Sequence, residues 1–231
     1  MENENVRLTY TKTTLDPNEV SILKIVGTDP SPEHRIILDR KKLIWIIGVL
    51  KKEGLRIVYT GGVFDQMHDG HVKYLAEAKL RGDILIVGVD DDDLTRQRKP
   101  DQPHRPIDPL GVRLTNLVHI RSVNILTVRT TAEPLEQLIF DLLPDVAVFS
   151  KGTKDAQEQE IRSQRGPYCG EIVFLEPQSG NSTTAKISKV MINGAHDLAV
   201  HLKKELDGKV DLSLLEKSVG SYFTKIQGGI K

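Results

Sequence analysis

Short apolar runs alternate with stretches of helical periodicity along the middle of the chain. In the helical stretches, apolar side chains recur every three or four residues. Strands that alternate with helices favour right-handed crossovers and a mainly parallel sheet. The apolar runs suit strands that are buried on both faces. We therefore predict an α/β fold with an open parallel sheet, whose strands lie at 55–60, 83–89, 124–128, 145–149 and 171–175 and whose helices lie at 70–81, 110–121 and 132–143.

The two ends of the chain differ from this alternating core. Residues 1–35 are polar and rich in Asp-Pro and Ser-Pro turn signals, and a helix with one apolar face is predicted for 39–54. After Ser182 the pattern is helical to the end, and it leaves open whether this segment is a dimerisation element or a lid. We divide the chain into an N-terminal lead-in and helix (1–54), a core domain (55–194) and a C-terminal helical appendage (195–231).

Composition narrows the class of protein. The 231 residues include 32 Lys and Arg against 32 Asp and Glu, and this neutral balance argues against a nucleic-acid surface. The single cysteine, Cys169, cannot form an internal disulfide, which suits a reducing cytosol. The acidic N-terminus does not resemble a secretory signal, and the longest apolar stretch, 43–50, is too short to span a bilayer. We expect a cytoplasmic protein that binds neither nucleic acid nor a membrane.

The strongest chemical signal lies between the first strand and the next helix, where residues 60–71 read TGGVFDQMHDGH. Ligands of open α/β sheets bind at the carboxyl ends of the strands, and a helix N-terminus there attracts anions. Gly61 and Gly62, expected in a turn, let the backbone approach a phosphate closely. His68 and His71 add donors that stabilise charge on a reacting phosphoryl group. The motif therefore predicts attack on phosphorus.

Two other interpretations of the histidine pair remain open. One is a surface turn with two incidental histidines, and the other is a zinc pair. No cysteine or nearby carboxylate triad completes a zinc ligand set. The position directly after a buried strand favours phosphate chemistry, and we predict no dedicated metal site.

Two further segments offer anion-binding groups. Ser182 is a good N-cap for an apolar helical stretch, and with Thr183 and Thr184 it forms a second anion cradle; plain helix capping is the alternative. Five Arg or Lys residues lie between Leu94 and Arg113, directly behind the acidic block at 90–93. We expect a solvated loop for most of this stretch, with a small positive site for a triphosphate and a sugar phosphate.

These motifs resemble the cytidylyltransferase-like nucleotidyltransferases, which carry a strand followed by a His-x-Gly-His helix start. The resemblance covers about 37–193 and is strongest to the adenylyltransferase domain of the bifunctional heptose-phosphate kinase/adenylyltransferases. It implies a Rossmann-like parallel sheet with extra helices at both termini. It also implies that an acceptor phosphate attacks the α-phosphorus of ATP or CTP, with Mg²⁺ on the triphosphate, in a homodimer.

The resemblance also implies roles for individual residues. Side chains that stabilise the transition state or neutralise phosphate charge are His68, His71, Lys99 and Arg113. Nucleotide-binding residues are Thr60, Gly61, Gly62, Phe64, Gly70, Ser182, Thr183 and Thr184. Residues that contact the acceptor are Asp65, Asp92, Lys151 and Gly152, with a local structural role as the alternative for Asp92.

Departures from the family pattern leave the substrates open. Lys151 and Gly152 match the start of a Lys-Gly-Gly-Asp-Tyr element, but the second Gly and the Tyr of that element are missing here. The cytidylyltransferases have an Arg shortly before the Ser-Thr-Thr turn, and this chain has Glu176-Pro177-Gln178 there. ATP with heptose 1-phosphate is the first choice. The alternatives are CTP with glycerol 3-phosphate or another alditol phosphate, FMN adenylylation, and a nucleotide-binding module that has lost turnover.

Overall fold

The computed structural model describes residues 32–102, 104–134, 136–151 and 166–177, together with isolated residues between 190 and 204. The predictions for Gly152, for 182–184 and for most of 195–231 lie outside the described residues.

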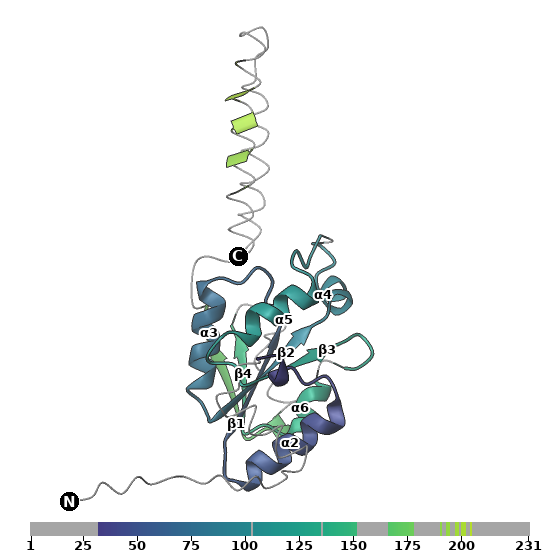
Figure 1. The fold of residues 1–231 in the computed structure, drawn as a ribbon, viewed down its shortest axis with the longest axis vertical. Coiled ribbons are helices and arrows are strands. Elements are labelled where there is room, and N and C mark those ends of the chain that lie inside the picture. Colours follow the sequence, from purple (N-terminus) through teal and green to yellow (C-terminus); the bar gives the residue numbers. More distant parts are fainter. Residues whose placement is uncertain are drawn as a thin grey trace, which may run out of the picture.

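Five parallel strands form one sheet in the order β3-β2-β1-β4-β5 (Figure 1). The strands are β1 (Ile57–Gly62), β2 (Ile84–Asp90), β3 (Ile125–Arg129), β4 (Val146–Ser150) and β5 (Glu171–Leu175). The α/β prediction is confirmed. The strand order reverses between β1 and β4, and ligands of such sheets bind at the carboxyl ends of the strands beside that switch point.

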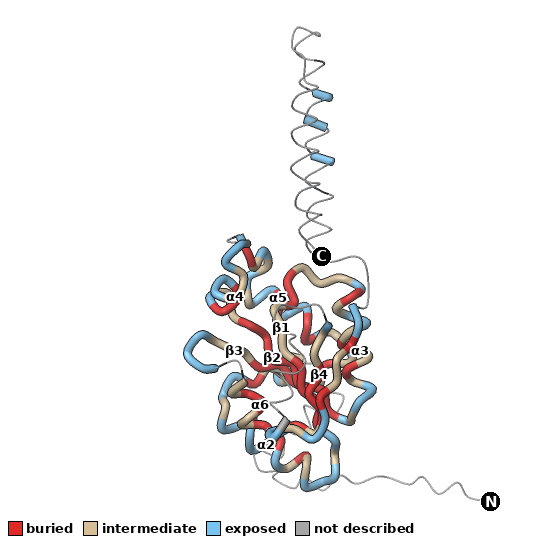
Figure 2. Tube along the Cα trace, turned by 180° about the vertical axis from the view of Figure 1, so that it is seen from behind, coloured by how far each residue is buried: buried red, intermediate tan, exposed pale blue. Residues whose placement is uncertain are grey.

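Helices cover both faces of the sheet. They are α2 (Arg40–Lys52), α3 (Asp69–Lys79), α4 (Asp92–Arg98), α5 (Leu110–Val118) and α6 (Gln137–Leu142), with short 3₁₀ turns η1 (Pro32–Arg35) and η2 (Gly166–Tyr168). Because successive strand residues point to opposite faces, Ile57 and Tyr59 pack with α2 and α6, whereas Val58 packs with α3 and α5. The strands therefore form the buried centre of the fold (Figure 2).

The predicted N-terminal helix is α2. The side chain of Asp39 caps it by accepting a hydrogen bond from the backbone N–H of Lys42 at 2.9 Å. Gly54, at φ 80°, follows the helix in the left-handed conformation that glycine adopts without strain. The apolar face of α2 is buried in the same core as the sheet, through Leu43, Ile46, Ile47 and Leu50. None of the helices in the described part of the chain is both long and apolar enough to cross a membrane.

Two local predictions are wrong. Gly61 and Gly62 do not form a turn but continue β1, because their backbone pairs with Gly88 and Val89 of β2. The acidic block at 90–93 is not a solvated loop. Its first residue closes β2 with a buried side chain, and its second residue caps α4, because an Asp carboxylate satisfies free N–H groups at a helix start.

Candidate active site

The two motif histidines lie together at the start of α3, directly beyond the carboxyl end of β1. His68 is the N-cap: its Nδ1 accepts a hydrogen bond from the N–H of Gly70 at 3.1 Å, and its carbonyl accepts from the N–H of His71 at 3.0 Å. The two rings stack, with centroids 3.9 Å apart. Since Nδ1 of His68 is an acceptor, the neutral ring carries its proton on Nε2. The backbone N–H groups of Gly70 and His71 are already hydrogen-bonded. The start of α3 therefore offers a ligand the two imidazole rings instead of these backbone donors.

His71 is held as a neutral ring. The pKa of His71 is lowered to about 4, mainly because the ring is buried and secondly because of its electrostatic interaction with His68. Its Nδ1 is buried and has no hydrogen-bond partner among the described residues. Phe64 packs its ring edge-on against the imidazole at a centroid distance of 5.6 Å. A buried nitrogen without a partner is costly unless a ligand satisfies it, so His71 is prepared to meet one.

Lys99 brings a positive charge to the same region. It is the C-cap of α4 and is half-buried. Burial lowers its pKa, and the neighbouring Arg105 and Arg98 lower it further. Among the described residues, no carboxylate pairs with its ammonium group. An anionic ligand would relieve both the repulsion and the missing partner.

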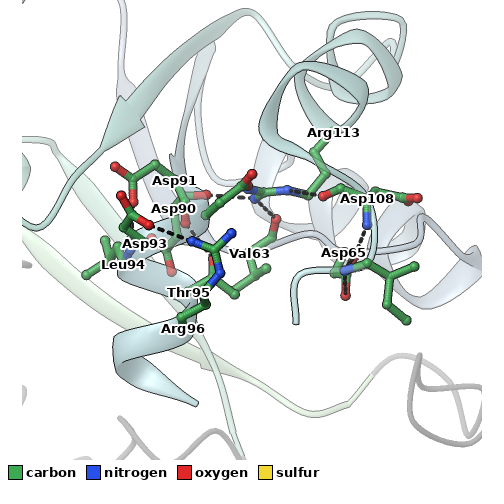
Figure 3. A network of polar contacts seen from close by, with 12 residues as sticks. Val63, Asp65, Asp90, Asp91, Asp93, Leu94, Thr95, Arg96, Asp108 and Arg113 are labelled. Atoms are coloured by element: carbon green, nitrogen blue, oxygen red, sulfur yellow. Dashed lines mark hydrogen bonds and ion pairs between the residues drawn. The ribbon is translucent and has the colours of Figure 1, made fainter. Parts of the chain in front are cut away.

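The loop between β1 and α3 is strained and braced. Phe64 and Gln66 have φ angles of 52° and 46°, in the left-handed region that non-glycine residues rarely adopt. Asp65, between them, is buried and accepts hydrogen bonds from the N–H groups of Ile107 at 3.1 Å and Asp108 at 3.0 Å (Figure 3). It also pairs with the guanidinium of Arg105 at 3.5 Å. In this structure Asp65, expected to contact the acceptor, holds two loops together.

Arg113, expected to contact phosphate, is completely buried instead. Its guanidinium donates to the carbonyls of Val63 at 2.6 Å, Asp90 at 2.7 Å and Asp108 at 3.0 Å (Figure 3). It also pairs with the carboxylate of Asp92 at 2.6 Å. Arg113 is therefore bound to backbone carbonyls and to Asp92, and Asp92 is bound to Arg113. These contacts place both residues where they brace the segments around the site.

Thr60 of β1 anchors α3 to the sheet. Its side chain is buried, donates to the carbonyl of Val148 at 3.0 Å and shares a 2.7 Å hydrogen bond with the hydroxyl of Tyr74. These contacts join β1, β4 and α3 at the switch point. In this arrangement the Thr60 hydroxyl is engaged by protein groups.

Both glycines at the end of β1 face close neighbours. A Cβ on Gly61 would lie 2.8 Å from the guanidinium carbon of Arg129, and one on Gly62 would lie 3.2 Å from the ring of Phe64. The absence of side chains therefore makes room for protein groups on the two sides of β1.

Lys151 lies at the carboxyl end of β4 and is exposed. It pairs with the carboxylate of Glu176, just beyond β5, at 2.7 Å. The remaining predicted contacts at Gly152, Ser182, Thr183 and Thr184 lie outside the described residues and stay predictions.

A buried ionic cluster beside the site was missed by the sequence analysis. Asp90 is fully buried and pairs with both Arg98 and Arg129. Asp90 and Arg129 are register partners in the β2–β3 pairing. The only signal in the sequence is a charged residue at the end of each of two apolar strands, and it becomes informative once that register is known.

Comparisons with known proteins agree with this geometry. A family model described as Cytidylyltransferase-like matches residues 59–187. Curated relatives named Bifunctional protein HldE, from Sodalis glossinidius (strain morsitans) and from Escherichia coli O1:K1 / APEC, are each 35% identical over 156 and 159 residues. The matches cover 67% and 68% of this chain but 31% and 32% of the relatives. The chain therefore spans about a third of their length.

A solved structure supports the fold. Pantoate-beta-alanine ligase from Francisella tularensis superposes with a TM-score of 0.54 over 80% of this chain and 85% of that chain, at 16% identity. The family model covers more than half of the chain, from within β1 through the histidine motif and the four strands that follow. The chain therefore belongs to the cytidylyltransferase-like family of nucleotidyltransferases.

Proposed function

We propose that the protein transfers a nucleotidyl group from a nucleoside triphosphate to a sugar phosphate and releases pyrophosphate. ATP and heptose 1-phosphate are the proposed substrates, and ADP-heptose is the proposed product. The observation that carries the proposal is the stacked pair His68 and His71 at the switch point, with a buried Nδ1 on His71 that lacks a protein partner.

The reaction needs no nucleophile from the protein. An oxygen of the acceptor phosphate attacks the α-phosphorus in line, the bond from that phosphorus to the bridging oxygen breaks, and pyrophosphate leaves. Catalysis then consists of positioning and charge stabilisation. The ring N–H groups of His68 and His71 donate hydrogen bonds to phosphate oxygens as charge builds up, and Lys99 balances the charge of the triphosphate.

Mg²⁺ belongs to the proposal through the nucleotide. Within the described residues, no group of three His, Cys, Asp or Glu side chains is placed to hold a metal ion. We therefore assign none of the described residues to the ion. Bound to the triphosphate, it would neutralise charge during transfer.

The choice of substrates rests on the relatives. The chain is 35% identical to the curated HldE proteins, and the motif resemblance is strongest to a heptose-phosphate adenylyltransferase domain. The alternatives are CTP with glycerol 3-phosphate or another alditol phosphate, and FMN adenylylation. On the same resemblance we propose a cytoplasmic homodimer.

The test is pyrophosphate release by the purified full chain from ATP or CTP, each paired with heptose 1-phosphate, glycerol 3-phosphate and FMN. The highest kcat/KM with ATP and heptose 1-phosphate supports the proposal. Preference for CTP and glycerol 3-phosphate replaces the substrates but keeps the reaction. Nucleotide binding without release in any pair overturns the reaction and indicates a binding module.

A further inference from the structure

The buried ionic cluster consists of Asp90, Arg98 and Arg129. Oδ1 of Asp90 accepts from Nε of Arg129 at 2.7 Å and from Nη2 at 2.5 Å, while Oδ2 pairs with the guanidinium of Arg98. The Asp90 side chain is fully buried, and the two arginine side chains are 20% and 12% exposed. Because burying charges carries a large desolvation penalty, a cluster of this kind is weak evidence for stability and calls for another role.

Asp90 is linked to the loop that carries the histidine pair. The backbone carbonyl of Asp90 accepts from Nη1 of Arg113, and the same Nη1 donates to the carbonyl of Val63 in the β1–α3 loop. Asp90 thus joins the end of β2 to the histidine loop through its backbone and to α4 through its side chain.

Arg129 is packed firmly in place. A Cβ on Gly61 would lie 2.8 Å from its guanidinium carbon, and one on Gly88 would lie 3.3 Å from its Cδ. The Tyr59 hydroxyl lies beside the same two glycines, 2.9 Å from a Cβ on either of them. Since Arg129 has no room to move towards the sheet, the carboxylate that it holds is also fixed.

Arg98 connects the fixed carboxylate of Asp90 to the end of α4, where Lys99 lies. Arg98 is the last residue of α4, and Lys99 is the C-cap, whose N–H donates to the carbonyl of Thr95 at 3.1 Å. The ion pair to Asp90 therefore anchors the end of α4 one residue before the lysine. Lys99 has no such anchor of its own among the described residues, and its positive charge is close enough to affect His71.

We propose that Asp90, Arg98 and Arg129 are positioning residues for Lys99: the fixed carboxylate holds Arg98, and Arg98 holds the end of α4 from which Lys99 reaches the phosphates. The inference rests on the proposed function. It differs from a purely structural salt bridge, because its effect on the reaction passes through Lys99 and vanishes when Lys99 is removed.

A double-mutant cycle on the full chain tests this coupling. The variants are Arg98→Met, Lys99→Met and the double variant, measured by ATP affinity and by pyrophosphate release. Displacing a binding group by about 1 Å costs roughly 100-fold in rate, so Arg98→Met is expected to lower kcat/KM by roughly that factor in the wild-type background. In the Lys99→Met background, we expect a further change of less than about twofold, as for residues that act as a unit.

Arg96→Met is the matched control. Arg96 lies on the same helix and pairs with Asp93 at 2.5 Å, but both side chains are exposed. Exposed ion pairs contribute little to stability, so this variant is expected to keep wild-type affinity and turnover. Thermal unfolding of each variant shows that it is folded.

A second substitution covers the case in which Arg98→Met does not fold. The cycle is then run with Arg98→Lys, which keeps the charge but loses the planar guanidinium. Its loss is expected to be smaller and again absent in the Lys99→Met background. Effects of Arg98 and Lys99 that multiply, or an Arg98 variant with wild-type kinetics, overturn the positioning role alone. A wild-type chain that neither binds ATP nor releases pyrophosphate overturns the proposed function and this inference together.

Discussion

Two groups of charged and polar side chains at the carboxyl edge of the sheet differ in how far the protein satisfies them. In the first, Nδ1 of His71 and the ammonium of Lys99 lack partners among the described residues. In the second, around Asp90 and Arg113, each charge faces an opposite charge or a backbone carbonyl. The first group is prepared for a ligand, and the second holds the segments that carry the first.

This contrast changes the meaning of the basic run between Leu94 and Arg113. By residue count it contains five positive side chains. Four of these pair with carboxylates, in the ion pairs Arg96–Asp93, Arg98–Asp90, Arg105–Asp65 and Arg113–Asp92. The positive charge left for a ligand in this run is therefore concentrated in Lys99.

The strongest test of the contrast is His71→Ala. Losing a donor to the transition state lowers kcat by about 100–1,000-fold, or about 2.7–4 kcal/mol. The free energy of unfolding changes much less, because Nδ1 of His71 makes no hydrogen bond within the described structure. Steady-state pyrophosphate release and urea unfolding measure the two effects. His119→Ala, at an exposed histidine, is the control. Near-normal turnover in His71→Ala would contradict the assignment of this site.

Arg113→Met is expected to show the opposite balance. Removing one partner of a buried ion pair leaves Asp92 and three carbonyls without their donor, so the free energy of unfolding falls by about 3 kcal/mol. Urea unfolding measures this loss, with exposed Arg121→Met as the control. If stability is unchanged but nucleotide affinity is lost, Arg113 contacts phosphate as the family resemblance implies.

Lys99→Met is expected to weaken ATP binding without lowering stability. A hydrogen bond to a charged group contributes about 1.5–3 kcal/mol, so the Kd rises about 10–100-fold. The unfolding free energy stays level or increases, because a half-buried ammonium with a lowered pKa is no longer desolvated. Calorimetric titration measures the affinity, and an unchanged Kd would remove Lys99 from the site.

The smallest expected effect is a pH dependence of stability that His71 causes. Its pKa is about 4 in the folded chain and about 6.5 when unfolded, so the unfolded chain binds more protons between these values. The stabilising contribution of the neutral ring is complete above about pH 6.5 and is lost as the pH falls towards 4. The difference in unfolding free energy between wild type and His71→Asn should therefore shrink over this range. A constant difference would show that the pKa of His71 is not lowered.

The element pattern was predictable wherever an apolar run carried the signal alone. The strand predicted at 171–175 is β5, and the helix predicted at 70–81 is α3, shifted by one residue at its start because His68 is the cap. The helix predicted at 132–143 is shorter, since α6 begins only at Gln137, after Pro134. Periodicity does not report where a helix begins when the preceding residues make turn contacts instead.

The sequence missed features that depend on pairing. Gly61 and Gly62 belong to β1 because β2 lies beside them, and Asp90 is buried because Arg129 of β3 lies opposite. The histidine motif was visible because its residues are close in the sequence and lie between a strand and a helix. The cluster behind Lys99 was not visible, because its members come from different elements.

The sequence by itself determined the fold class, the family and the position of the histidine motif, since each depends on residues within one element or one connection. The tertiary structure decided which charges are satisfied. The partners of Asp90 lie 8 and 39 positions away, and Asp92 and Arg113 are 21 positions apart. Charge neutralisation depends on distance in space. The parallel register and the packing of α4 and α5 therefore decide which arginines around Lys99 are paired with carboxylates, and leave Lys99 without such a pair among the described residues.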